Sequence, residues 1–101
     1  MSGVSNPYRY QYETVAASAT AQVLGGTGAI GDYLHRLIVT VTTPATGTVT
    51  LLDGATSIAI VPVTAAADVY TIDIEAASAV GAWKVTTGAG ASVVAVGIFS
   101  K

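Results

Sequence analysis

Cysteine is absent from this 101-residue sequence, which excludes disulfides, iron–sulfur clusters and thiolate zinc sites. Bulky side chains are also scarce: there are one Phe, one Trp and one Met beside 18 Ala and 14 Val. A core built from such small residues is thin, and a domain of this size buries only roughly 65% of its unfolded surface. We therefore expect association, as a homo-oligomer or on a larger assembly, to supply further burial.

Charge is sparse, since charged residues make up 10% of the chain and the net charge is −2. The four basic residues are scattered, without the cluster that a nucleic-acid backbone requires. No apolar run approaches the ~18 residues of a membrane span, and the first residues lack the basic start and apolar run of a signal peptide. We expect no nucleic-acid partner, no membrane partner and a protein made and used in water.

Short runs rich in Val, Ile and Thr recur between Gly, Pro, Asp and Ser, a pattern typical of an all-β domain. The sequence predicts an antiparallel β-sandwich of about seven strands, wired as a jelly roll or as an immunoglobulin-like fold. No segment is long enough to predict a helix. The expected strands cover residues 14–24, 33–42, 48–53, 57–61, 69–75, 82–87 and 92–99.

Alternation and turn residues support these strands. Leu37, Val39 and Val41 would share one face of a strand, and residues 70, 72 and 74 would oppose 71, 73 and 75. Asp53-Gly54 predicts a tight hairpin, and positive φ is expected at Gly47, Gly88 and Gly90. The pattern V-T-T-x5-V occurs at residues 41–49 and again at 85–93, which we interpret as two hairpins with similar turns that dominate a local topology.

Residues 1–13 differ in composition from the single domain expected over 14–101, and they predict an extended arm. Tyr8, Tyr10 and Tyr12 alternate with polar residues, so an extended arm places three aromatic rings on one face. That stripe would contact a partner surface or cover the domain's own sheet edge, and the sequence favours neither. Base stacking is a weaker alternative, because only Arg9 would meet phosphate there.

Two motifs suggest chemistry that their context does not support. Residues 26–31 (GTGAIG) match the dinucleotide-binding G-x-G-x-x-G, but a strand pattern follows where that site needs a helix. His35 is the only histidine, and on a strand Asp32 would not reach it as it would on a helix. We therefore expect a loop at 26–31, a packed imidazole at His35, and no cofactor, metal or catalytic site.

Three other side chains have a functional and a structural interpretation. Asp73 and Glu75 would share a strand face with Asp68 just before them, which suits an acid/base pair or a hard cation. A solvated face, or protection of a sheet edge, is the favoured interpretation. Trp83 could be a sugar-stacking platform, but in so small a core we favour an anchor in the core or at an interface.

Three segments resemble small virion proteins of tailed bacteriophages that are rich in Gly, Thr, Val and Ala: LHRLIVTV (34–41), GTVTLLDG (47–54) and GAWKVTTGAGASVVAVG (81–97). The resemblance rests on this composition and on the hairpin pattern, not on a diagnostic motif. Such proteins include capsid decoration, or cement, proteins, which are compact β-sandwich or jelly-roll domains bound as oligomers, often trimers, on the capsid surface.

The resemblance implies a protein of the virion that is made in the cytoplasm of its host and lies on the capsid surface. There it would bind the major capsid protein and itself and stabilise the shell without enzymatic activity. Candidate oligomer or capsid contacts are Tyr8, Tyr10, Tyr12 and Trp83. Alternatives are a head-fibre or tail accessory domain, a carbohydrate-binding module with Trp83 exposed, and a small enzyme built on Asp73 and Glu75.

Overall fold

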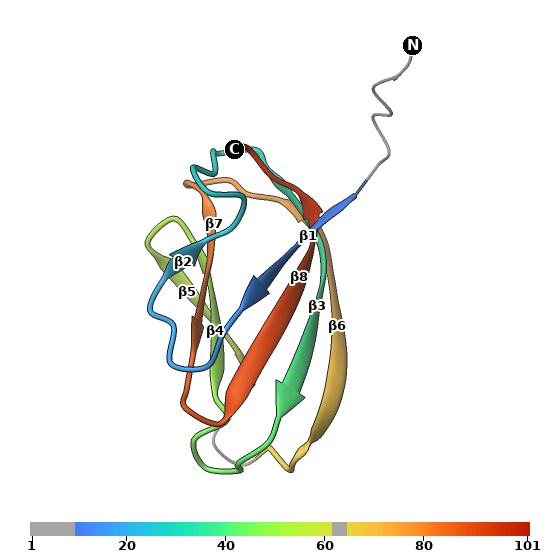
Figure 1. Cartoon of the computed structure of the whole chain (residues 1–101). Coiled ribbons are helices and arrows are strands. Elements are labelled where there is room, and N and C mark those ends of the chain that lie inside the picture. Colours follow the sequence, from blue (N-terminus) through green and yellow to red (C-terminus); the bar gives the residue numbers. More distant parts are fainter. Residues whose placement is uncertain (1–9, 62–64) are drawn as a thin grey trace.

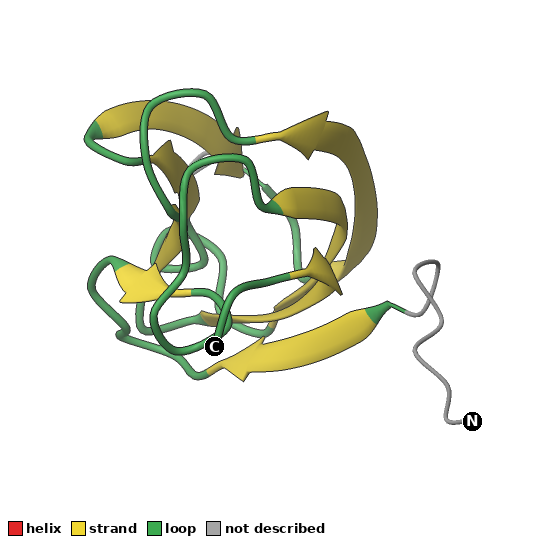
Figure 2. Cartoon of the chain, turned by 90° about the horizontal axis from the view of Figure 1, so that it is seen from above, coloured by secondary structure: helices red, strands yellow, loops and turns green. Residues whose placement is uncertain are grey.

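The computed structural model of the chain describes residues 10–61 and 65–101. This part consists of eight strands and loops, with no helix (Figures 1 and 2). The described residues therefore contain no helix that could cross a membrane. The strands are β1 (Gln11–Val15), β2 (Gln22–Val23), β3 (Tyr33–Val41), β4 (Val49–Asp53), β5 (Thr56–Val61), β6 (Asp68–Ala77), β7 (Trp83–Thr87) and β8 (Ala91–Ile98).

The strands form two antiparallel sheets of four. The first sheet has the order β1-β8-β3-β6, which can be followed across the front of Figure 1, and the second has the order β2-β7-β4-β5. The prediction of an all-β fold with antiparallel sheets is confirmed. Six of the seven expected strands are present with ends that differ by at most two residues.

The strands pair from the two ends of the chain inward: β1 pairs with β8, β2 with β7, β3 with β6 and β4 with β5. Only the last of these pairs joins strands consecutive in the chain. Its turn contains Gly54 at a φ of 61° and brings Asp53 opposite Thr56, which confirms the hairpin predicted from Asp53-Gly54. The other pairs join distant segments, so the expectation of a local topology is wrong.

Strand alternation fills the core from both sheets. Leu37, Val39 and Val41 on β3 are buried, as predicted. Their counterparts in the second sheet include Leu51 and Val85, both fully buried. Trp83 and Phe99 are the only aromatic side chains among the buried residues of the described part, so apolar burial rests mainly on Val, Leu and Ala.

The expected strand at 14–24 is two strands in the structure. β1 ends at Val15 and lies in the first sheet, whereas β2 begins at Gln22 and lies in the second. Between them Ser18 and Ala21 have φ values of 60° and 46°, a conformation that turns the chain out of the strand direction. β1 begins at Gln11, so residues 11–13 of the expected arm belong to the sheet, while residues 1–9 lie outside the described part.

The repeated V-T-T-x5-V segments are not hairpins. The first connects β3 in the first sheet to β4 in the second, and the other connects β7 in the second sheet to β8 in the first. These two connections contact each other: Gly90 N–H donates to Thr46 O at 3.0 Å and Gly88 N–H donates to Thr48 O at 2.8 Å. The similar sequences therefore form two sheet-crossing arches that pack together at one end of the molecule.

The glycines of these arches serve close approach. Gly47, Gly88 and Gly90 do not have the positive φ that we expected. A Cβ atom on Gly88 would overlap the carbonyl oxygen of Thr46, and one on Gly90 would overlap that of Thr43. Only glycine lets the two backbones come within hydrogen-bonding distance here.

We predict that Gly88→Ala lowers the free energy of unfolding by about 1–3 kcal/mol, the usual cost of overpacking a tight contact. Urea denaturation monitored by circular dichroism measures the change. Ala89→Ser, at the exposed neighbouring position, serves as the control and should shift stability by no more than about 0.5 kcal/mol. Equal stability of Gly88→Ala and wild type would show that the arches do not need this contact.

Candidate interaction surface

The outward-facing side of the first sheet, called the outer face below, carries most of the residues that the sequence singled out. Strand register places side chains there in rows across all four strands. One row contains Tyr12, Val96, Arg36 and Asp73, and the next contains Thr14, Val94, Ile38 and Thr71. The outer face is therefore apolar along β8, with aromatic and charged groups toward one end.

Tyr10, Tyr33 and His35 form an aromatic cluster on this face. The ring centroids of Tyr10 and His35 are 4.8 Å apart with planes inclined by 16°, and those of Tyr10 and Tyr33 are 6.2 Å apart. Partial desolvation, followed by the nearby Tyr10 and Glu75, raises the pKa of the Tyr33 phenol. The cluster joins the segment before β1 to β3 across the intervening β8.

An irregularity in β3 brings His35 and Arg36 to the same side. Leu34 and Leu37 are both fully buried, although residues three apart on a regular strand point to opposite faces. The register shifts between Leu34 and Arg36 against both neighbouring strands, as in a β-bulge. The two residues between the leucines consequently lie outside the core, with Arg36 Nη2 3.2 Å from His35 Nε2.

Asp73 and Glu75 lie on the solvent side of β6, an edge strand of the first sheet. Arg36 Nε is 3.5 Å from Asp73 Oδ1, and both side chains remain substantially exposed. Glu75 has a φ of 53° at the irregularity, a conformation that disrupts regular pairing. This arrangement agrees with the first of the two favoured interpretations, a solvated sheet face.

The tyrosine stripe is partly within the described residues. Tyr10 and Tyr12 are exposed, at 46% and 74% respectively, and Tyr8 lies outside them. Tyr12 lies on edge strand β1 opposite Val96 of β8. Two of the three rings are thus on the outer face, available to a partner.

Trp83 is a core residue, because only 4% of its surface is exposed. Its indole Nε1–H donates to the carbonyl oxygen of Asp32 at 2.8 Å, which satisfies the one polar atom of the ring. Of the two positions proposed for an anchor, the core is therefore the observed one. Trp83 therefore offers no stacking platform, and it is not one of the surface residues that a partner would contact.

Asp32 and the glycine-rich loop close the end of the molecule where the chain ends. The Asp32 carboxylate accepts hydrogen bonds from Ala29 N–H and from both Ser100 N–H and Ser100 Oγ–H. Gly28 N–H donates to Ser100 O at 3.0 Å. Strand β3 follows the loop, as expected, and the structure places Asp32 with Ser100 while His35 lies with the tyrosines.

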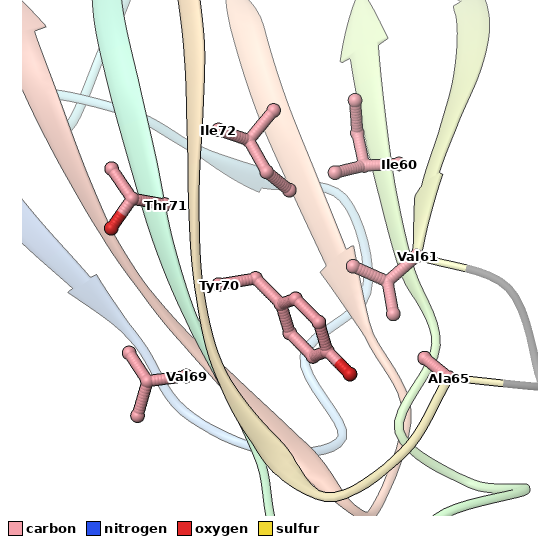
Figure 3. Close-up of a pocket in the computed structure, with 7 residues that line it drawn as sticks. All are labelled: Ile60, Val61, Ala65, Val69, Tyr70, Thr71 and Ile72. Atoms are coloured by element: carbon pink, nitrogen blue, oxygen red, sulfur yellow. The ribbon is translucent and has the colours of Figure 1, made fainter.

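A pocket of about 430 Å³, lined mainly by aliphatic side chains, lies between β5 and β6. Figure 3 shows Tyr70 and Ile72 pointing from β6 toward β5, while Val69 and Thr71 point to the other side. The phenolic O–H of Tyr70 donates to Ala66 O at 2.7 Å, so the main polar atom at the pocket has a partner. A binding site for a small molecule normally adds several converging polar groups to its apolar wall, and this lining provides few.

Residues 10–61 and 65–101 contain no group of three His, Asp or Glu side chains that could hold a metal ion. Comparison with known proteins adds no family: no family model, curated protein or solved structure matches the chain. The function must therefore be argued from the fold and this surface.

Asp53 is a structural residue whose role the sequence did not indicate beyond its hairpin. Its carboxylate accepts hydrogen bonds from Ala79, Val80 and Gly81 N–H at 2.9, 3.0 and 3.1 Å. These bonds, that of Ala79 foremost, lower the pKa of the Asp53 carboxyl against the opposing effect of desolvation. The β4–β5 turn is thereby fastened to the loop between β6 and β7.

We predict that Asp53→Asn reduces stability at about pH 7, since an amide cannot accept all three bonds. A carboxyl whose pKa is lowered by folding stabilises the protein above its ordinary pKa, and that stability is lost as pH falls through the folded pKa. The difference between wild type and variant should therefore shrink below about pH 4. Thermal denaturation across pH measures it, with the exposed Asp73→Asn as control; a gap that widens in acid would contradict the assignment.

We predict that Trp83→Phe costs about 1–3 kcal/mol, because it removes buried volume and leaves the Asp32 carbonyl without its indole donor. Urea unfolding monitored by circular dichroism measures the loss. Tyr70→Phe, which removes one exposed hydrogen bond, should cost less than about 1 kcal/mol. Similar losses in the two variants would argue against Trp83 as the core anchor.

Proposed function

We propose that this protein is a structural component of a virus particle, which binds the outside of the capsid as a homo-oligomer and stabilises the shell. The strand order is the observation that carries the proposal. Pairing of β1 with β8, β2 with β7, β3 with β6 and β4 with β5 is that of one long antiparallel ribbon rolled into two sheets. We propose that the fold is a jelly-roll sandwich, an architecture common in viral capsid and lectin domains.

Self-association is supported by what the isolated chain leaves uncovered. The core consists mainly of Val, Leu and Ala. Large apolar side chains remain exposed on both edge strands of the first sheet, including Tyr12 on β1 and Val69 on β6. Covering such side chains gains about 25 cal/mol per Å². A homo-oligomer, with a trimer favoured by the resemblance to decoration proteins, provides that cover.

The shell partner in this proposal is the major capsid protein, and the tyrosine stripe is the contact. Tyr10 and Tyr12 are exposed on the outer face, and Tyr8 adjoins them in the sequence. Tyrosine buries a large area at little entropic cost, which suits it to an interface. Several weak contacts made by one oligomer add to firm binding, and an oligomer that binds only the assembled shell stabilises it by mass action.

The alternatives have less support. A head-fibre or tail accessory domain would use the same fold and oligomer and differs only in its place on the particle. A carbohydrate-binding module relied on an exposed Trp83, but that ring is 4% exposed. An enzyme built on Asp73 and Glu75 would need a cleft, whereas these residues lie on the exposed side of an edge strand.

The direct test uses empty heads assembled from the major capsid protein encoded in the same viral genome. The purified protein should co-sediment with these heads, saturate at a fixed ratio, and raise the temperature at which they fall apart. Tyr10→Ala/Tyr12→Ala should weaken binding about tenfold or more, since truncating a buried interface tyrosine costs about 1.4 kcal/mol or more.

Tyr70→Phe serves as the matched control, because its phenol bonds within the chain at Ala66 O, and it should bind as wild type does. Absence of co-sedimentation for folded wild-type protein at any concentration would overturn the capsid proposal. Binding by a tail assembly in the same assay would instead favour the accessory domain.

A further inference from the structure

We infer that copies of this chain join edge to edge, with β1 of one copy adding to β6 of the next, and that this pairing closes a ring. The inference deepens the proposed function and rests on its self-association. It names the two surfaces that meet and the symmetry that follows. The occupant of each free edge is a second copy of this chain.

The first sheet has two unpaired edges in the described part of the chain. β1 pairs only with β8 and β6 pairs only with β3, so neither strand has a strand partner on its other side. Single side chains of the same copy bond two backbone groups of these strands: Gln22 Nε2–H donates to Thr14 O at 3.1 Å, and Val69 N–H donates to Asp68 Oδ1 at 2.7 Å. Strand addition would exchange these exposed bonds for ladder bonds. Such edges are templates for strand addition. β6 has ten residues and is the longest strand, which makes its edge the larger of the two.

Strand direction makes β1 and β6 compatible. Neighbours in the order β1-β8-β3-β6 are all antiparallel, so β1 and β6 run in opposite directions. A second copy rotated about an axis along the strands keeps its strand directions, and its β1 is then antiparallel to β6 of the first copy. This contact uses different surfaces on the two copies, and such contacts close into rings when the rotation allows.

Charge disfavours the alternative in which two β6 edges meet. β6 contains Asp68, Asp73 and Glu75 and no basic residue, so pairing it with itself opposes acids with acids, which is destabilising. β1 contains one acid, Glu13, and its carboxylate already accepts hydrogen bonds from Gly25 N–H and Gln22 Nε2–H. Pairing β1 with β6 therefore brings one acid, held within its own copy, to the three acids of β6, whereas pairing β6 with itself brings three to three.

Length and exposure indicate where on β6 the pairing occurs. Glu75, at a φ of 53°, interrupts the end of β6 that contains Asp73, and residues 68–72 remain regular. β1 has five residues, which matches that stretch. Antiparallel pairing with matched faces puts Tyr12 and Thr14 beside Thr71 and Val69 on the outer face, a set of aromatic and β-branched neighbours that stabilises sheets.

The absence of cysteine permits a direct test by crosslinking. In Thr14→Cys/Val69→Cys the two thiols lie at opposite edges of one sheet, about 14 Å apart across its strands and offset by two residues along them, which is beyond the about 7 Å limit between Cα atoms for a disulfide. Oxidation to a disulfide should therefore link different copies. We expect the larger part of the protein to shift from the monomer band to a ladder ending in a closed ring of the size measured by light scattering.

The single variants distinguish a ring, in which β1 meets β6, from a twofold dimer, in which two identical edges meet. Thr14→Cys alone and Val69→Cys alone should stay monomeric on the denaturing gel, because each ring contact contains one residue of each kind. Ser92→Cys/Val69→Cys is the matched control, since Ser92 is exposed on the interior strand β8, and it should also stay monomeric. Thermal denaturation verifies that every variant is folded.

A covalent dimer from either single variant would show a twofold edge contact and overturn the inference, as would a double variant that stays uncrosslinked while light scattering shows an oligomer. Wild-type protein that is monomeric at all concentrations would overturn both this inference and the proposed homo-oligomer. Ring crosslinking without binding to heads would leave the inference standing and remove the capsid proposal.

Discussion

The backbones of the two arches touch at Gly88 and Gly90, and the rest of the fold is arranged around that contact. One arch carries the chain from β3 in the first sheet to β4 in the second, and the other carries it back from β7 to β8. Hydrogen bonds from Gly88 and Gly90 to the other arch join them. Because a side chain at Gly88 would overlap Thr46 O, the alignment of the two sheets at this end depends on its absence.

The opposite end is held by polar groups of the loops. Asp32 connects the glycine-rich loop to Ser100 and accepts the Trp83 indole N–H, while Asp53 gathers three backbone N–H groups of the loop before β7. Carboxylates that accept several backbone N–H bonds make strong, directional connections. The two aspartates contribute to a fold whose apolar core contains few large side chains.

The same shortage of large side chains links the fold to its proposed role. Aromatic groups lie on the surface as well as in the core: Tyr10 stacks on His35 and Tyr12 is 74% exposed. A sheet with two free edges and an exposed apolar outer face gains stability by association. In the proposed particle, with many identical neighbours, such association would add weak individual contacts into firm binding.

Strand positions were predictable, because alternation and turn residues are local properties. Leu37, Val39 and Val41 show the period of two directly, and Asp53-Gly54 marks its hairpin. The candidate surface was foreseen in part, through the tyrosine alternation and the paired acids at Asp73 and Glu75. His35 could not be placed beside Tyr10, since they are 25 positions apart in the chain and only the shared sheet brings them together.

The sequence alone determined that the chain forms short antiparallel strands around a core of small residues, because side-chain volume and alternation are set residue by residue. Tertiary structure alone decided which strands pair and what the repeated V-T-T-x5-V segments do. Both outcomes depend on contacts between segments tens of residues apart, where a glycine serves a tight turn or a close backbone approach equally well. At Gly88 the second use prevails, since the neighbouring arch leaves no room for a Cβ atom.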